Sequence, residues 1–75
     1  MPESIHYMGY VVCGKAKPRA DGSWAGGYTI AADGGRKLIR TTNVVAVRET
    51  QEAAYSAGIF YGLLHVDESL QMHVA

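Results

Sequence analysis

The 75-residue sequence has few of the features that mark secreted or membrane-spanning proteins. Its single cysteine, Cys13, has no second cysteine to pair with, so an internal disulfide is excluded. The longest uncharged apolar stretch, residues 57–66, is about half of the roughly 20 residues that a membrane-spanning helix needs. No basic segment followed by an apolar run, the pattern of a secretory signal, precedes the first apolar residues. Together these absences predict a cytoplasmic protein without a membrane segment.

Net charge is also absent, because seven Lys and Arg residues balance seven Asp and Glu residues. A neutral chain is not expected to attract DNA or acidic lipid over its whole surface, and it lacks the repulsion that keeps small proteins apart. The charges are nevertheless separated along the chain. Residues 15–48 carry +5 and the remainder carries −5, so we expect a basic strand region and an acidic helix and chain ends.

The overall composition predicts one small folded domain spanning residues 1–75. Hydrophobic residues make up 48% of the chain and charged residues 19%, which is a globular balance. A core of this size supplies on the order of 3–5 kcal/mol of stability, so self-association is an ordinary way to bury more surface.

Three stretches rich in β-branched and aromatic residues predict strands at residues 5–13, 23–31 and 36–42. Residues 33–35, Asp-Gly-Gly, predict a hairpin turn, so the second and third strands should be antiparallel neighbours. A loop is expected at residues 14–22, which contain the turn pair Asp-Gly. The paired glycines Gly26 and Gly27 indicate a bulge or a close backbone approach.

A helix is predicted from about residue 51 to about residue 66, with Thr50 as its N-cap and Glu52 in its first turn. Residues 43–48 either prolong the sheet or form an apolar connection, and residues 69–75 either fray or form a short edge strand. The predicted fold is therefore α+β (β-β-β-α): a three-stranded antiparallel sheet packed on one face by a single C-terminal helix.

The predicted helix has two apolar faces, whereas a helix packed on a sheet needs only one. We expect the first of these faces to lie on the sheet: Ala53, Ala57, Phe60, Tyr61 and Leu64. The second is covered either by the tail or by another chain: Tyr55, Ile59, Leu63 and Val66. Small residues at positions 54, 58 and 62 form a groove for close backbone approach, either to the chain's own sheet or tail or to a partner.

No recognised catalytic or metal-binding pattern is present in the sequence. It contains neither a nucleophile-elbow motif nor a phosphate-binding loop. His65, Asp67, Glu68 and His73 have a spacing that matches no closed zinc or calcium motif. We interpret Cys13 as a half-buried strand residue. The sequence therefore predicts a protein that is not an enzyme, with no catalytic residue, no cofactor and no metal ion.

Basic and aromatic residues are interleaved in the strand region, as a nucleic-acid platform requires. The candidate nucleic-acid contacts are Lys15, Lys17, Arg19, Trp24, Tyr28, Arg36, Lys37 and Arg40. The alternative is that these cations keep one sheet face solvated and protect its edges from pairing.

The stretches Gly22-Ser23-Trp24-Ala25 and Thr50-Gln51-Glu52-Ala53-Ala54-Tyr55 resemble parts of the plant ethylene-responsive (GCC-box) DNA-binding domain. That family has three strands followed by one helix and reads the major groove with its sheet, so the resemblance implies that layout and a DNA-binding sheet. The family's base-reading arginines flank a glycine in the first strand, whereas Met8 and Tyr10 flank Gly9 here. The sequence also resembles small uncharacterised bacterial proteins of β-β-β-α layout, and this likeness implies no activity.

From these observations we expect a small bacterial, non-catalytic interaction module. Its partner is a protein or a second copy in a homodimer, bound through the second apolar face of the helix: Tyr55, Ile59, Leu63 and Val66. The alternative function is nucleic-acid binding through the basic, aromatic-containing sheet.

Overall fold

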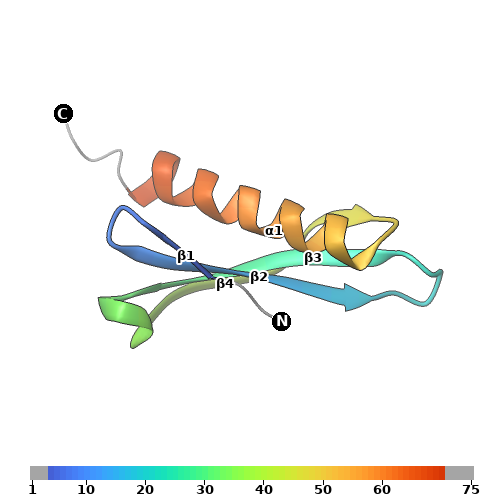
Figure 1. Ribbon diagram of the computed structural model, residues 1–75, viewed down its shortest axis with the longest axis horizontal. Coiled ribbons are helices and arrows are strands. Elements are labelled where there is room, and N and C mark those ends of the chain that lie inside the picture. The colour runs from blue at the N-terminus through green and yellow to red at the C-terminus, as the bar shows by residue number, and fades with distance from the viewer. Residues whose placement is uncertain (1–3, 71–75) are drawn as a thin grey trace.

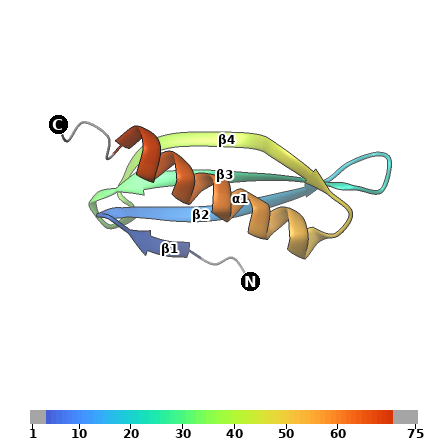
Figure 2. The same cartoon turned by 90° about the horizontal axis from the view of Figure 1, so that it is seen from above.

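The computed structural model describes residues 4–70 and has two layers, a sheet and one helix. The elements are β1 (Ser4–Tyr7), β2 (Tyr10–Pro18), β3 (Trp24–Ala32), a 3₁₀ turn η1 (Asp33–Gly35), β4 (Lys37–Arg48), α1 (Gln51–His65) and a π-helical turn η2 (Val66–Leu70). The strands are antiparallel in the order β1-β2-β3-β4, and α1 crosses one face of the sheet (Figure 1, Figure 2). The α+β class with an antiparallel sheet and a C-terminal helix is confirmed.

The predicted number of three strands is wrong, because the sheet has four strands. The stretch expected to form one strand at residues 5–13 folds back on itself at Met8 and Gly9. Both residues have positive φ angles, 54° and 87°, and Tyr7 pairs with Tyr10 across the turn. Two consecutive left-handed residues are the geometry of a tight β-hairpin, for which glycine at the second position is favoured. Gly9 in the apolar run was therefore the signal for a turn.

β2 extends beyond residue 13, where the first predicted strand ended, because it continues through Pro18 into the expected loop at residues 14–22. The turn that remains is closed by a backbone hydrogen bond from Arg19 N to Ser23 O (2.8 Å). Asp21 Oδ1 accepts hydrogen bonds from Ser23 Oγ (2.6 Å) and Ser23 N (3.0 Å). Both hydrogen bonds lower the pKa of Asp21, and the bond from the Ser23 hydroxyl has the larger effect.

The remaining strand predictions are close to the observed elements. β3 lies within one residue of the predicted span, and its pairing with β4 shifts register between Gly26 and Tyr28, which agrees with the irregularity expected at the paired glycines. Residues 43–48 prolong the sheet as part of β4. The predicted tail, residues 69–75, lies outside the described residues except for its first two positions, which belong to η2.

Helix α1 begins where the sequence indicates. Thr50 is the N-cap, and its Oγ1 accepts a hydrogen bond from Ala53 N (3.1 Å). The side that faces the sheet, however, is the small-residue groove, because Ala54, Gly58 and Gly62 are the buried residues of α1. The prediction that the larger apolar residues of the helix face the sheet is therefore wrong. Phe60, the largest of them, is 60% exposed.

The physical reason is a contact between the helix backbone and the sheet backbone. A Cβ atom added to Gly58 would overlap the carbonyl oxygen of Gly27 on β3, and one added to Gly26 would overlap the carbonyl oxygen of Ala54. On β2, a Cβ at Gly14 would lie 2.8 Å from Ile59 Cγ1. Real Cβ atoms do not tolerate such distances, so only glycine fits at these three positions between the two layers.

The apolar core lies toward the C-terminal end of α1, beyond this glycine contact. It consists of Val12, Tyr28, Ile30 and Val66, all buried, with Tyr7, Tyr10, Val45 and Leu63 packed against them. The ring of His65 lies 6.2 Å from that of Tyr28, between centroids. Burial lowers the pKa of His65, and the positive charge of Arg40 lowers it further.

We expect Gly58→Ala to lower the free energy of unfolding by about 2–3 kcal/mol, because overpacking is costly and the obstructing atom belongs to rigid backbone. Helix propensity alone predicts the opposite sign, since alanine is favoured over glycine by about 1 kcal/mol in an exposed helix. Urea unfolding followed by circular dichroism measures the difference. Ser56→Ala, at an exposed position of the same helix, is the control and should change stability by less than about 0.5 kcal/mol. An unchanged or raised midpoint for Gly58→Ala contradicts the close approach.

Candidate functional site

The outward side of α1 is apolar in its C-terminal half. Phe60 is 60% exposed and Tyr61 is 37% exposed, while Leu63 and Leu64 are half-buried. The two aromatic rings meet edge to face, with centroids 5.4 Å apart and planes at 78°. This edge-to-face arrangement is a favourable one for aromatic rings and holds Phe60 at the surface.

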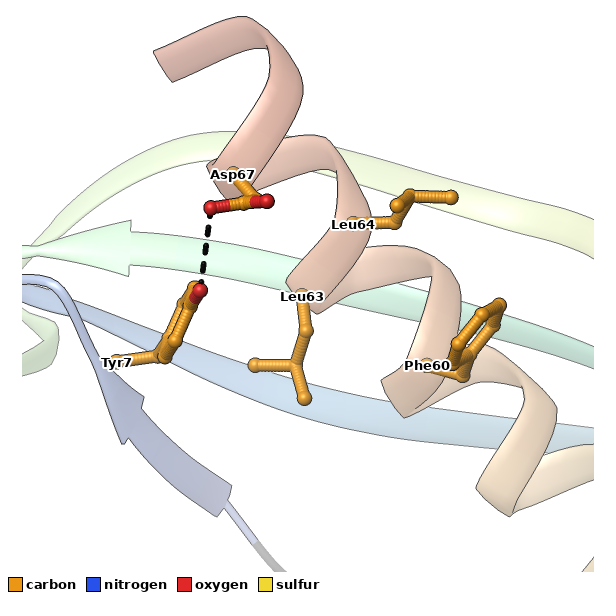
Figure 3. Close-up of a pocket in the computed structure, with 5 residues that line it drawn as sticks. All are labelled: Tyr7, Phe60, Leu63, Leu64 and Asp67. Atoms are coloured by element: carbon orange, nitrogen blue, oxygen red, sulfur yellow. Dashed lines mark hydrogen bonds between the residues drawn. The ribbon is translucent and has the colours of Figure 1, made fainter. Parts of the chain in front are cut away.

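Beside Phe60 the surface has a shallow hollow of about 250 Å³, which we call the outer hollow. It is lined by Tyr7, Phe60, Leu63, Leu64 and Asp67. Figure 3 shows that Tyr7 comes from the end of β1, whereas the other four residues come from α1 and the turn that follows it. The hollow therefore joins two segments that are far apart in the sequence, and its walls are apolar except at Tyr7 and Asp67.

The two polar residues that line the outer hollow are joined by a hydrogen bond. The Tyr7 hydroxyl donates to Asp67 Oδ1 over 3.2 Å (Figure 3). This bond raises the pKa of Tyr7, and burial and the negative charge of Asp67 raise it further. The bond links the end of β1 to η2, so the wall of the hollow includes residues of both segments.

Most of the residues predicted as a partner interface lie along the flank of α1 or at the start of η2, and not on the outward side. Val66 is fully buried in the core, and Tyr55 and Ile59 are half-buried over Gly14 of β2, where a Cβ would lie 3.0 Å from Tyr55 O. Only Leu63 of this set also lines the outer hollow. The chain's own sheet thus covers much of the second apolar face.

Sequence reasoning assigned Phe60 and Leu64 to the core and did not single out Tyr7. The signal that could have found them is the small-residue spacing in the helix, at positions 54, 58 and 62, together with the glycines of the second and third strands. Small residues on both surfaces indicate a close contact, and the bulky residues of the helix must then lie elsewhere.

Among the predicted nucleic-acid contacts, Lys15 and Lys17 lie on the same open face of the sheet, the face opposite α1. They pair with Gly27 and Ala25, and the Lys15 ammonium donates a hydrogen bond to Asn43 Oδ1 (2.7 Å). Arg19 lies just beyond the end of β2, where its Nε is 3.9 Å from Asp21 Oδ1.

The other predicted cations lie elsewhere. Arg36 and Lys37 follow η1, which lies at the end of the molecule opposite the turn between β2 and β3 (Figure 2). The molecule is 43 Å long. Arg40 pairs with Ile30 on the helix side of the sheet. The structure thus groups Lys15 and Lys17 but separates them from Arg36, Lys37 and Arg40.

The aromatic residues of the strands lie on the helix side. Tyr7, Tyr10, Trp24 and Tyr28 share this side with the core residues Val12 and Ile30 by strand register. Tyr28 is only 5% exposed, so its ring is not accessible to a base. Within residues 4–70, the open face carries cations without an aromatic side chain beside them.

Residues 4–70 contain no group of three or more His, Cys, Asp or Glu side chains placed to hold a metal ion. In the same residues, no helix has both the length and the apolar character needed to cross a membrane.

No known protein family, no curated protein and no solved structure matches this chain.

We expect Asp67→Asn to bring the pKa of Tyr7 down toward its ordinary value of 10.0, because it removes the charged acceptor that stabilises the phenol. In the native protein the raised pKa contributes stability that is complete below pH 10 and is lost as the pH rises through the folded-state pKa of Tyr7. Carbon NMR of the tyrosine rings, recorded as a pH titration, measures the shift. Glu68→Gln removes the neighbouring exposed carboxylate and should leave Tyr7 unchanged. If both variants behave alike, the assigned hydrogen bond is not the cause.

Proposed function

We propose that this chain is a small, non-catalytic interaction module that self-associates through the outward side of α1. In the proposed homodimer, Phe60 of each copy enters the outer hollow of the other. The observation that carries the proposal is the 60% exposure of Phe60 beside an apolar hollow of about 250 Å³. A large aromatic side chain next to an apolar depression is the kind of anchor that dominates binding energy at interfaces.

A second copy is favoured as the partner by charge and by symmetry. The chain has a net charge of zero, so two copies approach without overall repulsion. A two-fold dimer uses the same patch on both subunits, so each copy supplies one anchor and one hollow. The exposed carboxylates near the patch, Asp67 and Glu68, repel their counterparts modestly. Added salt screens that repulsion, so the dimer should not weaken as salt rises.

The cytoplasmic location and the bacterial source stay part of this proposal. The single cysteine, Cys13, suits a reducing compartment. It is unpaired and half-buried on the open face.

Phe60→Ser is expected to weaken self-association at least about tenfold, because it removes the apolar anchor. Sedimentation equilibrium or light scattering at high micromolar concentration measures the oligomeric state. Val44→Ser, which changes a side chain 55% exposed on β4, is the matched control and should leave the dimer intact. A native chain that stays strictly monomeric overturns the proposed function.

Nucleic-acid binding is the second candidate function, and the observation that favours it is the pair Lys15 and Lys17 on one open face, close to Arg19. If these cations contact phosphates, affinity for labelled DNA or RNA falls steeply with salt, since bound counterions are released. Lys17→Gln should then weaken binding and reduce the salt dependence by about one phosphate contact. Titration at two salt concentrations measures both effects, and absence of binding at the lower one excludes this candidate.

A further inference from the structure

The two edges of the sheet are protected very differently. The strand order places β1 and β4 at the edges. β1 has four residues, and a short edge strand is one of the ways in which proteins avoid unwanted pairing. β4 has twelve residues and is the longest strand. Figure 2 shows β4 along one long edge with no described element beyond it. Its outer backbone N–H and C=O groups are therefore free to pair with another strand.

β4 also carries much of the exposed apolar surface. Of the eight large hydrophobic side chains that are exposed in the described chain, four lie on β4: Leu38 (63%), Val44 (55%), Val47 (43%) and Ile39 (38%). A long edge strand with exposed apolar side chains is the usual site for the addition of a further strand.

The charge of this edge has one sign. Residues 36–48 contain Arg36, Lys37, Arg40 and Arg48 and no Asp or Glu. Such an edge attracts an acidic partner and repels a second copy of itself.

Basic and apolar residues occupy different sides of the edge. Directly opposed residues in antiparallel strands lie on the same side of the sheet. Three basic residues pair with helix-side residues of β3: Lys37 with Ala32, Arg40 with Ile30 and Arg48 with Trp24. Leu38 and Val47 pair with Ala31 and Ala25, on the open face. At these five paired positions the edge is basic on its helix side and apolar on its open side, whereas Ile39 and residues 43–45 lie where the pairing with β3 shifts register.

We propose that β4 binds an extended acidic peptide, which adds to the sheet as a fifth strand. Because side chains of a strand alternate between the two sides, the peptide that fits has acidic residues alternating with apolar or β-branched ones. The backbone hydrogen bonds supply affinity, and the alternation supplies specificity. This surface is separate from the outer hollow, so the inference does not depend on the proposed homodimer.

A nucleic acid fits this edge less well. The described residues of β4 include no aromatic side chain on which a base can stack. Phosphates also lack the alternating donors and acceptors that an unpaired strand edge requires, whereas a peptide backbone supplies both.

The experiment uses the full chain and a short acetylated peptide in which glutamate alternates with valine and threonine, because the two register shifts in β4 interrupt its alternation over its full length. Two further versions carry N-methyl groups on alternate residues, one at the odd positions and one at the even positions. An added strand donates hydrogen bonds to β4 from only one of these sets. We therefore expect one methylated peptide to lose at least about tenfold in affinity and the other to bind as the parent does. Amide NMR shifts on addition of the parent peptide should concentrate in β4.

A charge-reversed pair tests the specificity. Lys37→Glu combined with Arg40→Glu should weaken binding of the glutamate peptide at least about tenfold and create binding of a peptide in which lysine replaces glutamate. Circular dichroism establishes that this variant is folded. Phe60→Ser, which disrupts only the proposed homodimer, should bind the glutamate peptide as the native chain does.

Three outcomes overturn the inference. The first is no binding of the glutamate peptide, and the second is equal binding of both methylated versions, which indicates general electrostatic attraction. The third is a random-sequence oligonucleotide that binds more tightly than the peptide and displaces it from β4, which assigns the basic edge to nucleic acid.

Discussion

The contact between the backbone of α1 and the backbone of β3 is the constraint on which the rest of the structure depends. Gly58 lies against the carbonyl group of Gly27, and the carbonyl group of Ala54 lies against Gly26. Because no side chain separates the layers at these positions, bulky helix residues have no room beneath the helix and lie on its flanks or its outward side. The exposure of Phe60 and the burial of Gly58 are thus two results of one packing arrangement.

A single helix on a four-stranded sheet leaves two kinds of surface available. The C-terminal half of α1 is apolar on its outward side, and the polar residues of the outer hollow, Tyr7 of β1 and Asp67 of η2, lie at one side of it. The edge formed by β4 is basic and offers unpaired backbone groups. The binding proposed for the first surface depends on shape and that proposed for the second on charge and strand geometry, so we expect salt to affect them in opposite directions. Because the two surfaces share no residue, the two proposed interactions do not compete.

Features set by neighbouring residues could be predicted from the sequence. The turn at residues 33–35 and the cap at Thr50 depend on local conformational preferences, and both were predicted correctly. The fourth strand was missed because a two-residue turn at Met8 and Gly9 barely interrupts an apolar run. The sheet-facing side of α1 was predicted wrongly because hydrophobicity ranks phenylalanine and leucine above glycine. The complementarity between Gly58 and Gly27 joins residues far apart in the chain and is not visible in the pattern of the helix alone.

Contact through backbone also determines how the stability of the fold responds to temperature. Three of the seven buried hydrophobic residues in the described chain are alanines: Ala25, Ala31 and Ala54. Where Gly58 meets Gly27 and Ala54 meets Gly26, the helix–sheet contact consists of peptide groups. Exposure of apolar surface raises the heat capacity on unfolding, whereas exposure of peptide groups lowers it. We therefore expect a small heat-capacity increment for its length and a broad, shallow dependence of the free energy of unfolding on temperature.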